Sequence, residues 1–271
     1  MLVAIFALSA CKSTEMAQEA ASDAVSENTE SMESPMATAE PSGDADVSVD
    51  DIIAKHIEAR GGADNIKAVN TVKMTGKLEV MGMDVDMTNY IKRPDKMRAR
   101  LYISSMDAEV NQGYDGEMGW MQNPGADPQP MPEQMSKGMK DQASIDGQLM
   151  DYADKGYTIE YVGEGMVNDN PAYKLKLMRS EQPESIIYID KASYLQVKTE
   201  GEGVNPQNGQ PMQTETFMSD FRSVDGIQMP FVTEVKVDGN TMQKMVMETI
   251  EVNVEVSDDL FMMPSMSVDI K

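Results

Sequence analysis

Hydrophobic and polar positions alternate with a period of two along much of the chain after residue 70. In residues 72–80 every second position is apolar or glycine, and the positions between them are Lys, Thr and Glu. Residues 83–88 and 97–103 continue this alternation. Because successive side chains of a strand point to opposite faces, these segments predict strands that share one apolar face.

Further strands and tight turns follow along the chain. We expect strands at residues 157–163, 172–178, 185–190, 195–200, 212–221, 231–237 and 242–254. Dipeptides that tolerate the positive φ angles of a tight strand reversal occur at Asp115-Gly116, Asn208-Gly209, Asp225-Gly226 and Asp238-Gly239. These signals predict an antiparallel meander and a mainly β (α+β) fold.

The segment before the first strand has helical spacing instead. A helix is predicted to begin at Ser48, with Asp51 three residues on as a capping arrangement, and to end at Gly61-Gly62. The apolar stripe of this helix comprises Ile52, Ile53, His56 and Ile57. A short second turn is expected over residues 63–69.

Between residues 121 and 157 the spacing of apolar residues again becomes helical. The recurring positions are Met131, Met135, Met139, Ala143 and Leu149 or Met150. We expect one helix or two, interrupted by Gly138 and Gly147. A large antiparallel sheet with one apolar face needs cover, which this segment can provide.

A targeting signal stands at the start of the sequence. The apolar run from Leu2 to Leu8 is too short to span a bilayer, but its length is typical of a secretory signal. The residues Leu8-Ser9-Ala10-Cys11 resemble the bacterial lipobox, whose cysteine is lipidated and becomes the N-terminus after cleavage. We therefore expect residues 1–11 to be a lipoprotein signal peptide that ends in the lipidated Cys11. The alternatives are an ordinary signal peptide and a misplaced start.

Composition divides the rest of the chain into a tether and a domain. Residues 12–47 are small, polar and acidic, with no aromatic residue and one basic residue, so we expect a disordered acidic tether with a root-mean-square span of about 35 Å. Residues 48–271 suffice for one domain with its own core. Because Lys12 is not the Asp associated with inner-membrane retention, we expect Cys11 to anchor the protein in the outer membrane. The expected location is its periplasmic face, and exposure at the cell surface is the alternative.

Charge and residue usage exclude several functions. The formal net charge is −23, which disfavours nucleic acid and anionic headgroups as partners. One histidine and one cysteine cannot form a His-rich or Cys-rich zinc site. We expect His56 to be a packed core residue, because it lies on the apolar stripe of the first helix and no serine elbow accompanies it. The sequence thus indicates no enzyme, no cofactor and no metal.

Four segments together resemble a known family. They are "ARGGADNIKAVNTVKMTGK", "YDGEMGW", "YIDKASYLQVK" and "FRSVDGIQMPF". In order and spacing they are similar to the landmarks of outer-membrane lipoprotein-sorting proteins, the superfamily of the LolA and LolB carriers, over residues 49–264. The resemblance implies an unclosed antiparallel β-barrel, or half-barrel, with helices covering its concave face and an apolar cavity for acyl chains. It also implies a carrier or receptor without catalysis, and the lipobox favours a membrane-anchored acceptor.

Methionine use is compatible with such a cavity. The chain has 27 Met and nine Leu residues, and flexible thioether side chains suit a pocket for varied chains as well as they suit an irregular core. As the cavity wall we expect the apolar members of the alternating strands: Met74, Leu78, Met87, Met97, Leu101, Ile103, Trp120, Leu175, Leu177, Ile187, Ile189 and Val235. As lid residues we expect Met135, Met139 and Leu149.

Two other functions stay open at this point. An envelope sensor or scaffold could use the same fold to bind a protein partner instead of a lipid. Less favoured is a Cu(I)-binding protein, because thioethers are soft copper ligands. The methionines concerned are Met81, Met83, Met245, Met247, Met262, Met263 and Met266.

Overall fold

The computed structural model describes residues 48–80, 82–180, 182–204 and 211–265. The expectations for Cys11, for the tether of residues 12–47 and for the Asn208-Gly209 turn lie outside the described residues.

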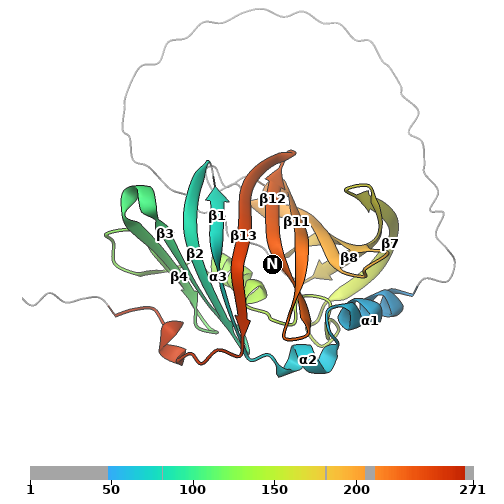
Figure 1. Cartoon of the computed structure of the whole chain (residues 1–271), viewed down its shortest axis with the longest axis horizontal. Helices are drawn as coiled ribbons and strands as arrows, with labels where there is room; N and C mark the ends of the chain where they lie inside the picture. Colours follow the sequence, from blue (N-terminus) through green and yellow to red (C-terminus); the bar gives the residue numbers. More distant parts are fainter. Residues whose placement is uncertain (1–47, 81, 181, 205–210, 266–271) are drawn as a thin grey trace, which may run out of the picture.

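Thirteen strands form one curved antiparallel sheet (Figure 1). The first six are β1 (Thr71–Val80), β2 (Met83–Lys92), β3 (Lys96–Ile103), β4 (Ala108–Tyr114), β5 (Gly119–Gln122) and β6 (Gln129–Pro130). The other seven are β7 (Thr158–Val167), β8 (Asn170–Arg179), β9 (Gln182–Asp190), β10 (Gln196–Val204), β11 (Pro211–Val224), β12 (Ile227–Val237) and β13 (Asn240–Val252). Their order in the sheet is β6-β5-β4-β3-β2-β1-β13-β12-β11-β10-β9-β8-β7.

The sheet consists of two meanders joined at one seam. The chain builds β1 to β6 outward, crosses to β7 at the far edge, and returns strand by strand until β13 pairs with β1. The edge strands β6 and β7 belong to opposite ends of the sheet, so the barrel is unclosed. The predicted half-barrel is therefore confirmed. The sheet contains two meanders, however, where the sequence predicted one.

The seam requires a glycine. The register between β1 and β13 shifts between Thr75 and Gly76. A Cβ atom on Gly76 would lie 2.2 Å from the carbonyl oxygen of Val246. The two meanders thus approach too closely at this point for any side chain.

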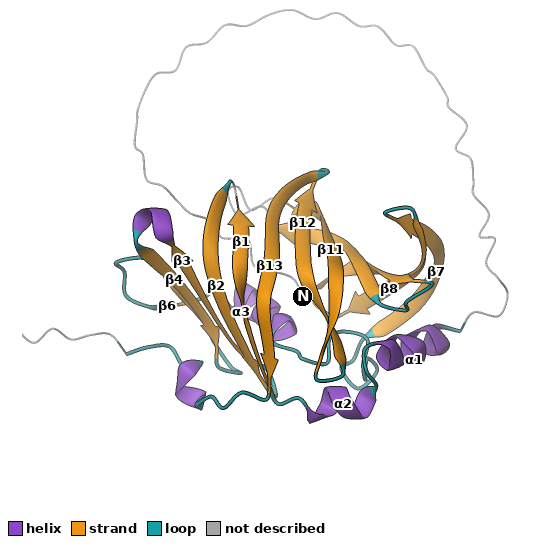
Figure 2. Ribbon diagram, viewed as in Figure 1, coloured by secondary structure: helices purple, strands orange, loops and turns teal. Residues whose placement is uncertain are grey.

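Three α-helices flank the sheet (Figure 2). They are α1 (Val49–Ala59), α2 (Ala63–Ala68) and α3 (Glu133–Gln142), and short 3₁₀ helices cover Ser104–Met106 and Asp258–Leu260. As expected, α1 ends before Gly61 and Gly62, whose φ angles are 121° and 87°. Ser48 is the N-cap residue by position, but its side chain accepts no capping hydrogen bond.

The predicted helix break at Gly138 is wrong. Gly138 lies inside α3, where it has no positive φ angle and a Cβ atom would meet nothing within 4 Å. The helix is followed by a turn-rich segment, residues 143–151, which we call the strap. Gly147 does mark a reversal in the strap, with a φ angle of 75°.

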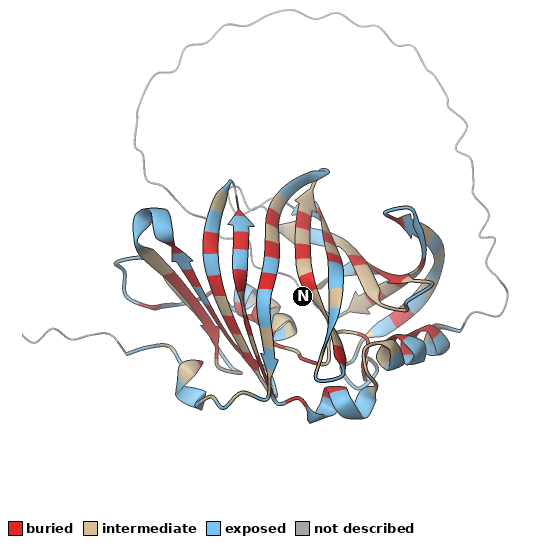
Figure 3. Cartoon of the chain, in the orientation of Figure 1, coloured by how far each residue is buried: buried red, intermediate tan, exposed pale blue. Residues whose placement is uncertain are grey.

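Burial alternates along the strands, as the period-two pattern predicts (Figure 3). The inward side chains form two apolar clusters. The first packs α3 and the strap against β1–β4, β12 and β13 and includes Leu78, Met87, Leu101 and Met139. The second packs α1 against β7–β9 and includes Ile52, Leu175, Leu177, Ile187 and Ile189. Each half of the concave face therefore has its own cover.

Two glycine substitutions test the seam. Gly76→Ala should lower the free energy of unfolding by about 1–3 kcal/mol, because the new methyl group forces β1 and β13 apart. Gly138→Ala is the matched control and should raise it by about 0.5–1 kcal/mol, because Ala favours a helix. Urea unfolding followed by far-UV circular dichroism measures both. Equal effects of the two substitutions would contradict the close contact at the seam.

Candidate functional site

A cavity of about 270 Å³ lies on the concave side of the sheet. Members of both apolar clusters line it, among them Met74 and Met247 from the first and Leu149 from the second. Small-molecule sites typically enclose roughly 300–1,000 Å³, so this cavity lies just below that range. The interior of the half-barrel is therefore not filled completely by its own side chains.

One wall of the cavity is apolar and another carries hydroxyl groups. The apolar wall comes from β1, β2 and β13, through Val72, Met74, Ile91, Met247 and Ile250. The hydroxyl groups come from β9 to β12, through Ser185, Thr199, Thr214, Thr216 and Thr233. We call these five residues the hydroxyl band. This wall is therefore more polar in composition than the wall formed by β1, β2 and β13.

The strap and the end of α3 cover the cavity. Ser144, Ile145 and Leu149 of the strap are among its lining residues, as is Asp141 of α3. The Asp141 carboxylate lies 3.1 Å from the Arg179 guanidinium and accepts a hydrogen bond of 2.8 Å from Gln182. Because Arg179 and Gln182 belong to the β8–β9 hairpin, α3 is tied to the half of the sheet opposite its own.

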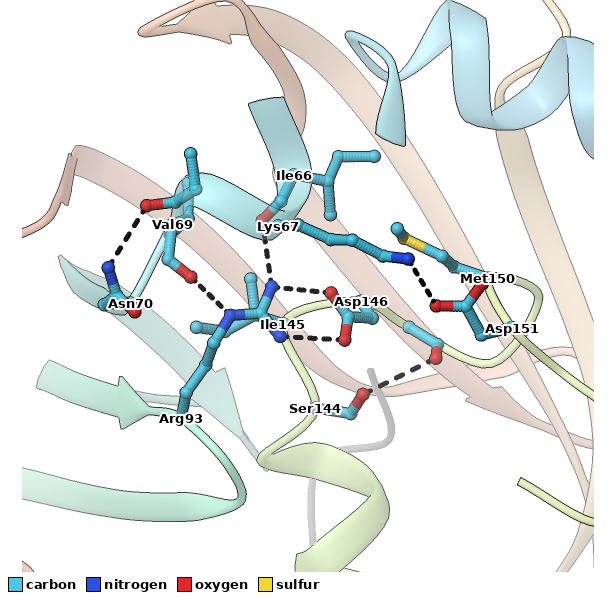
Figure 4. A network of polar contacts seen from close by, with 12 residues as sticks. Ile66, Lys67, Val69, Asn70, Arg93, Ser144, Ile145, Asp146, Met150 and Asp151 are labelled. Carbon is cyan, nitrogen blue, oxygen red and sulfur yellow. Dashed lines mark hydrogen bonds and ion pairs between the residues drawn. The ribbon is translucent and has the colours of Figure 1, made fainter. Parts of the chain in front are cut away.

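An ion pair fastens the strap to the first half of the sheet (Figure 4). Arg93, after β2, binds Asp146 with two hydrogen bonds of 2.6 and 2.8 Å. The same guanidinium donates to the backbone carbonyls of Ile66 and Val69, on α2 and just after it. The hydrogen bonds from Arg93 lower the pKa of Asp146 from its usual value. One guanidinium therefore joins α2, β2 and the strap.

Further basic groups bind strap carbonyls. Arg60 Nη1 donates to the carbonyl of Asp146 at 2.8 Å, and Lys155 Nζ donates to those of Gly147 and Met150 at 2.7 and 2.8 Å. By contrast, the ion pair between Lys67 and Asp151, also seen in Figure 4, is about half exposed on both sides. The strap is held mainly by the buried and half-buried contacts.

His56 is a packed core residue that also lines the cavity. It is 3% exposed, and its Nδ1 donates to the backbone carbonyl of Tyr194 at 2.9 Å. Burial is the main reason that its pKa falls from 6.5 to about 4. The imidazole is therefore neutral at physiological pH. Its hydrogen bond holds α1 against the segment around Tyr194.

Only some of the residues expected in the cavity wall and lid line the observed cavity. Met74 lines the cavity, and so does the expected lid residue Leu149. The others on the concave face are buried but are not among the lining residues: Leu78, Met87, Met97, Leu101, Ile103, Leu175, Leu177, Ile187, Ile189 and Val235. Most of these side chains pack under α1, α3 and the strap, so ligand contact by them stays a prediction.

One expected cavity-wall residue, Trp120, lies on the other face of the sheet. Trp120 pairs with Gly113, which pairs with Arg98, and cross-strand partners share one face of a sheet. Because Met97 faces the concave core, Arg98 and Trp120 lie on the convex face. There the Arg98 guanidinium is 4.4 Å from the indole centroid, and Trp120 Nε1 donates to the Phe261 carbonyl at 2.9 Å.

The two expected lid residues on α3, Met135 and Met139, differ in how far they are buried. Met139 is 2% exposed and packs into the first cluster, whereas Met135, one turn earlier in α3, is 51% exposed. Met135 therefore is not buried against the sheet, and it is not among the residues that line the cavity.

Nothing in the described part of the chain marks a metal centre or a membrane helix. Residues 48–265, apart from their gaps, contain no group of three or more His, Cys, Asp or Glu side chains that could hold a metal ion. No helix among them is both apolar and long enough to cross a bilayer. Of the methionines considered for copper, Met245 and Met247 are buried in the first cluster and Met262 is 54% exposed. Met81 and Met266 lie outside the described residues.

The strap contacts and the hydroxyl band were not among the sequence expectations. No local pattern links Arg93 to Asp146, which is 53 positions away. The band did leave a signal, since Thr214 and Thr216 alternate in phase with Met218, and Thr233 with Phe231. Hydroxyl residues at inward positions of a strand indicate a polar patch on its buried face.

Comparison with known proteins supports the fold. The sequence matches no protein-family model, and no curated protein matches it. A LolA superfamily protein from Nitrosomonas europaea superposes with a TM-score of 0.54 at 12% identity, covering 80% of this chain and 98% of that one. A DUF1329 family protein from Desulfovibrio piger gives 0.55 at 12% identity, over 79% and 97%.

These similarities define the class of fold. The chain has a LolA-like half-barrel fold, which the expected family resemblance implied. The Mycobacterium tuberculosis lipoprotein LppX gives a TM-score of 0.32 at 10% identity, over 78% of this chain and 100% of that one. At these identities the likeness concerns the fold alone.

The His56 pKa predicts a pH dependence of stability. The folded-state pKa of about 4 is below the value of 6.5 for the free side chain, so between these values the unfolded chain binds more protons. Stability should therefore fall as the pH drops from 6.5 towards 4, with His56 accounting for about 2–3 kcal/mol between pH 7 and pH 4.5. His56→Gln should lose less stability than the parent over this interval in urea unfolding. An identical loss would show that His56 does not carry the effect.

The Arg93–Asp146 pair should govern opening of the strap. Arg93→Gln leaves a half-buried carboxylate without its partner, so we expect a loss of about 1–3 kcal/mol and faster hydrogen exchange at strap amides. Lys67→Gln removes only an exposed pair and should therefore cost clearly less stability than Arg93→Gln. Hydrogen exchange monitored by mass spectrometry compares the strap with α1 in both variants. Equal protection of the strap in the two variants would contradict this role for Arg93.

Proposed function

We propose that this protein binds a lipid through its acyl chain inside the half-barrel, as a carrier or receptor in the cell envelope, and that it catalyses no reaction. The observation that carries the proposal is the covered cavity with an apolar wall on the concave face. Burial of hydrocarbon on Met74, Met247 and Ile250 would stabilise a guest by the same hydrophobic effect that stabilises the core.

The cover suits a site that must open and close. Its fastening uses hydrogen bonds and ion pairs at the rim of the sheet, such as those of Arg60 and Arg93. On opening, water can take over these hydrogen bonds, so the polar groups of the strap would not be left unpaired. Strap opening would expose the apolar wall long enough to admit a chain.

Membrane attachment through Cys11 belongs to the same proposal. Multiple acyl chains on a lipobox cysteine would hold the protein at a membrane, and the sequence favours the outer membrane on its periplasmic side. The long acidic segment that follows would then let the half-barrel reach ligands away from the surface. More specifically, we propose that the protein acts in lipoprotein sorting. The lipobox and the LolA-like fold together support this role.

Blocking the cavity tests the proposal. Ile250 lines the cavity, whereas Val246 on the same strand is 40% exposed on the convex face. Ile250→Trp should weaken binding of a fluorescent C16 fatty acid at least about tenfold by filling the space. Val246→Trp is the matched control and should leave the affinity unchanged. The full chain is used, after delipidation, with circular dichroism to confirm folding.

The purified protein itself provides the second measurement. Organic extraction followed by mass spectrometry should yield phospholipid or acyl chains from the parent and less from Ile250→Trp. An extract without lipid, together with no binding of the fatty acid, would contradict lipid carriage. If a single envelope protein were instead crosslinked from the strap, the sensor or scaffold function would replace it.

A further inference from the structure

We infer that the segment after β13, residues 253–261, controls opening of the strap from the other face of the sheet. We call this segment the clamp. Figure 1 shows it running from the end of β13 past the ends of β2 and β4. Its contacts are with convex-face residues of β2, β3 and β5, whereas the strap packs on the concave face. Such control goes beyond the proposed function, because it does not depend on what the cavity binds.

An aromatic contact anchors the end of the clamp. Phe261 and Trp120 are both 0% exposed, yet neither belongs to an apolar cluster of the concave face. Trp120 Nε1 donates to the Phe261 carbonyl at 2.9 Å, and the Arg98 guanidinium covers the indole. A Cβ atom on Gly113 would lie 2.5 Å from the indole, so the ring rests directly on the backbone of β4. The convex face therefore has a built site for the end of the clamp.

Two lysines hold the middle of the clamp. The Asp258 carboxylate lies 2.6 Å from Lys92 Nζ and 2.8 Å from Lys96 Nζ. Lys92 Nζ also donates to the Val256 carbonyl at 3.0 Å. Hydrogen bonds from the two lysines lower the pKa of Asp258 to about 2, so the carboxylate is charged at neutral pH. The clamp is thus tied to the end of β2 as well as to β5.

The start of the clamp holds the linker between α2 and β1. The Asn253 backbone amide donates to the Thr71 carbonyl at 2.7 Å. The Asn253 side-chain oxygen accepts from the Asn70 backbone amide at 2.8 Å. Thr71 Oγ1 donates to the Val254 carbonyl at 2.7 Å. Three hydrogen bonds therefore fix the linker against the clamp.

The strap is fastened to the same linker and the same strand end (Figure 4). The Arg93 backbone amide donates to the Asn70 carbonyl at 2.9 Å. Its guanidinium donates to the Val69 carbonyl and binds Asp146 of the strap. Lys92, which holds the clamp, directly precedes Arg93. Because successive residues of a strand point to opposite faces, these two neighbours join the clamp on one side of the sheet to the strap on the other.

Detachment of the clamp would therefore loosen the strap. Lys92 would lose its partners and the Asn70 amide its acceptor, so the backbone on both sides of the Arg93 guanidinium would be free to move. The hydrogen bonds of Arg93 need that backbone in place, since they weaken steeply when their geometry is distorted. Coupling of this kind is reciprocal, so strap opening must weaken the clamp by the same free energy. A partner that took hold of the clamp would open the cavity without touching its cover.

Hydrogen exchange at strap amides tests the coupling from the clamp side. In the full chain, Phe261→Ala removes the buried anchor, and Asp258→Asn removes an exposed carboxylate. Both should speed exchange at residues 143–151, by at least about fivefold in Phe261→Ala. Val167→Ala, at a buried apolar position in the opposite edge strand, is the matched control and should leave the strap at the parent rate. Exchange in α1 is the internal reference.

The reverse direction uses a variant of the strap. Asp146→Asn should speed exchange at the backbone amides of Leu260 and Phe261, which donate to carbonyls within the clamp. We expect an increase of at least about fivefold, although the substitution is on the opposite face of the sheet. Lys67→Gln, which removes only an exposed contact of the strap, is the control and should leave these amides unchanged.

Coupling and independent local contacts give different results. Faster exchange in both directions, absent from the two controls, is the expected outcome. If Phe261→Ala frees the clamp while the strap exchanges at the parent rate, or if strap and α1 accelerate equally, the inference is overturned. Should Phe261→Ala unfold the domain, Asp258→Asn decides the question alone, because its side chain is exposed. None of these results measures fatty-acid binding, so failure of the coupling leaves the proposed function intact.

Discussion

The pairing of β1 with β13 is the contact on which the rest of the structure depends. It joins two meanders that would otherwise be separate sheets, and it brings residues near the two ends of the described chain together. The shared sheet then curves enough to need cover on its inner side. The helices and the strap provide that cover from two sides, and the cavity is the space that they leave between them.

The strands could be predicted from the sequence because period-two alternation is a local signal. The alternation in residues 72–80 and the turns at Asp225-Gly226 and Asp238-Gly239 correspond to elements of the sheet. The pairing of β1 with β13 could not be predicted in this way, since it joins residues far apart in sequence. Gly138 shows a related limit: tertiary packing of Met139 holds α3 together through a residue that weakens an isolated helix.

The site was harder to predict than the fold because apolar character does not distinguish a cavity wall from a core. Leu177 and Met74 have similar patterns along their strands, yet only Met74 lines the cavity. Which inward residues meet empty space depends on where α1 and the strap end. The polar positions were the more informative ones. Thr216, for example, places a hydroxyl group at an inward position of β11, where a packed core usually has an apolar side chain.

The position of Trp120 has a consequence for spectroscopy. The only indole of the chain is stacked under Arg98 on the convex side of β5, with the sheet between it and the cavity. Its emission would report the integrity of that edge and of the segment around Phe261, and would change little when a guest enters. An unaltered intrinsic fluorescence on mixing with a lipid is therefore no sign that the hollow is empty.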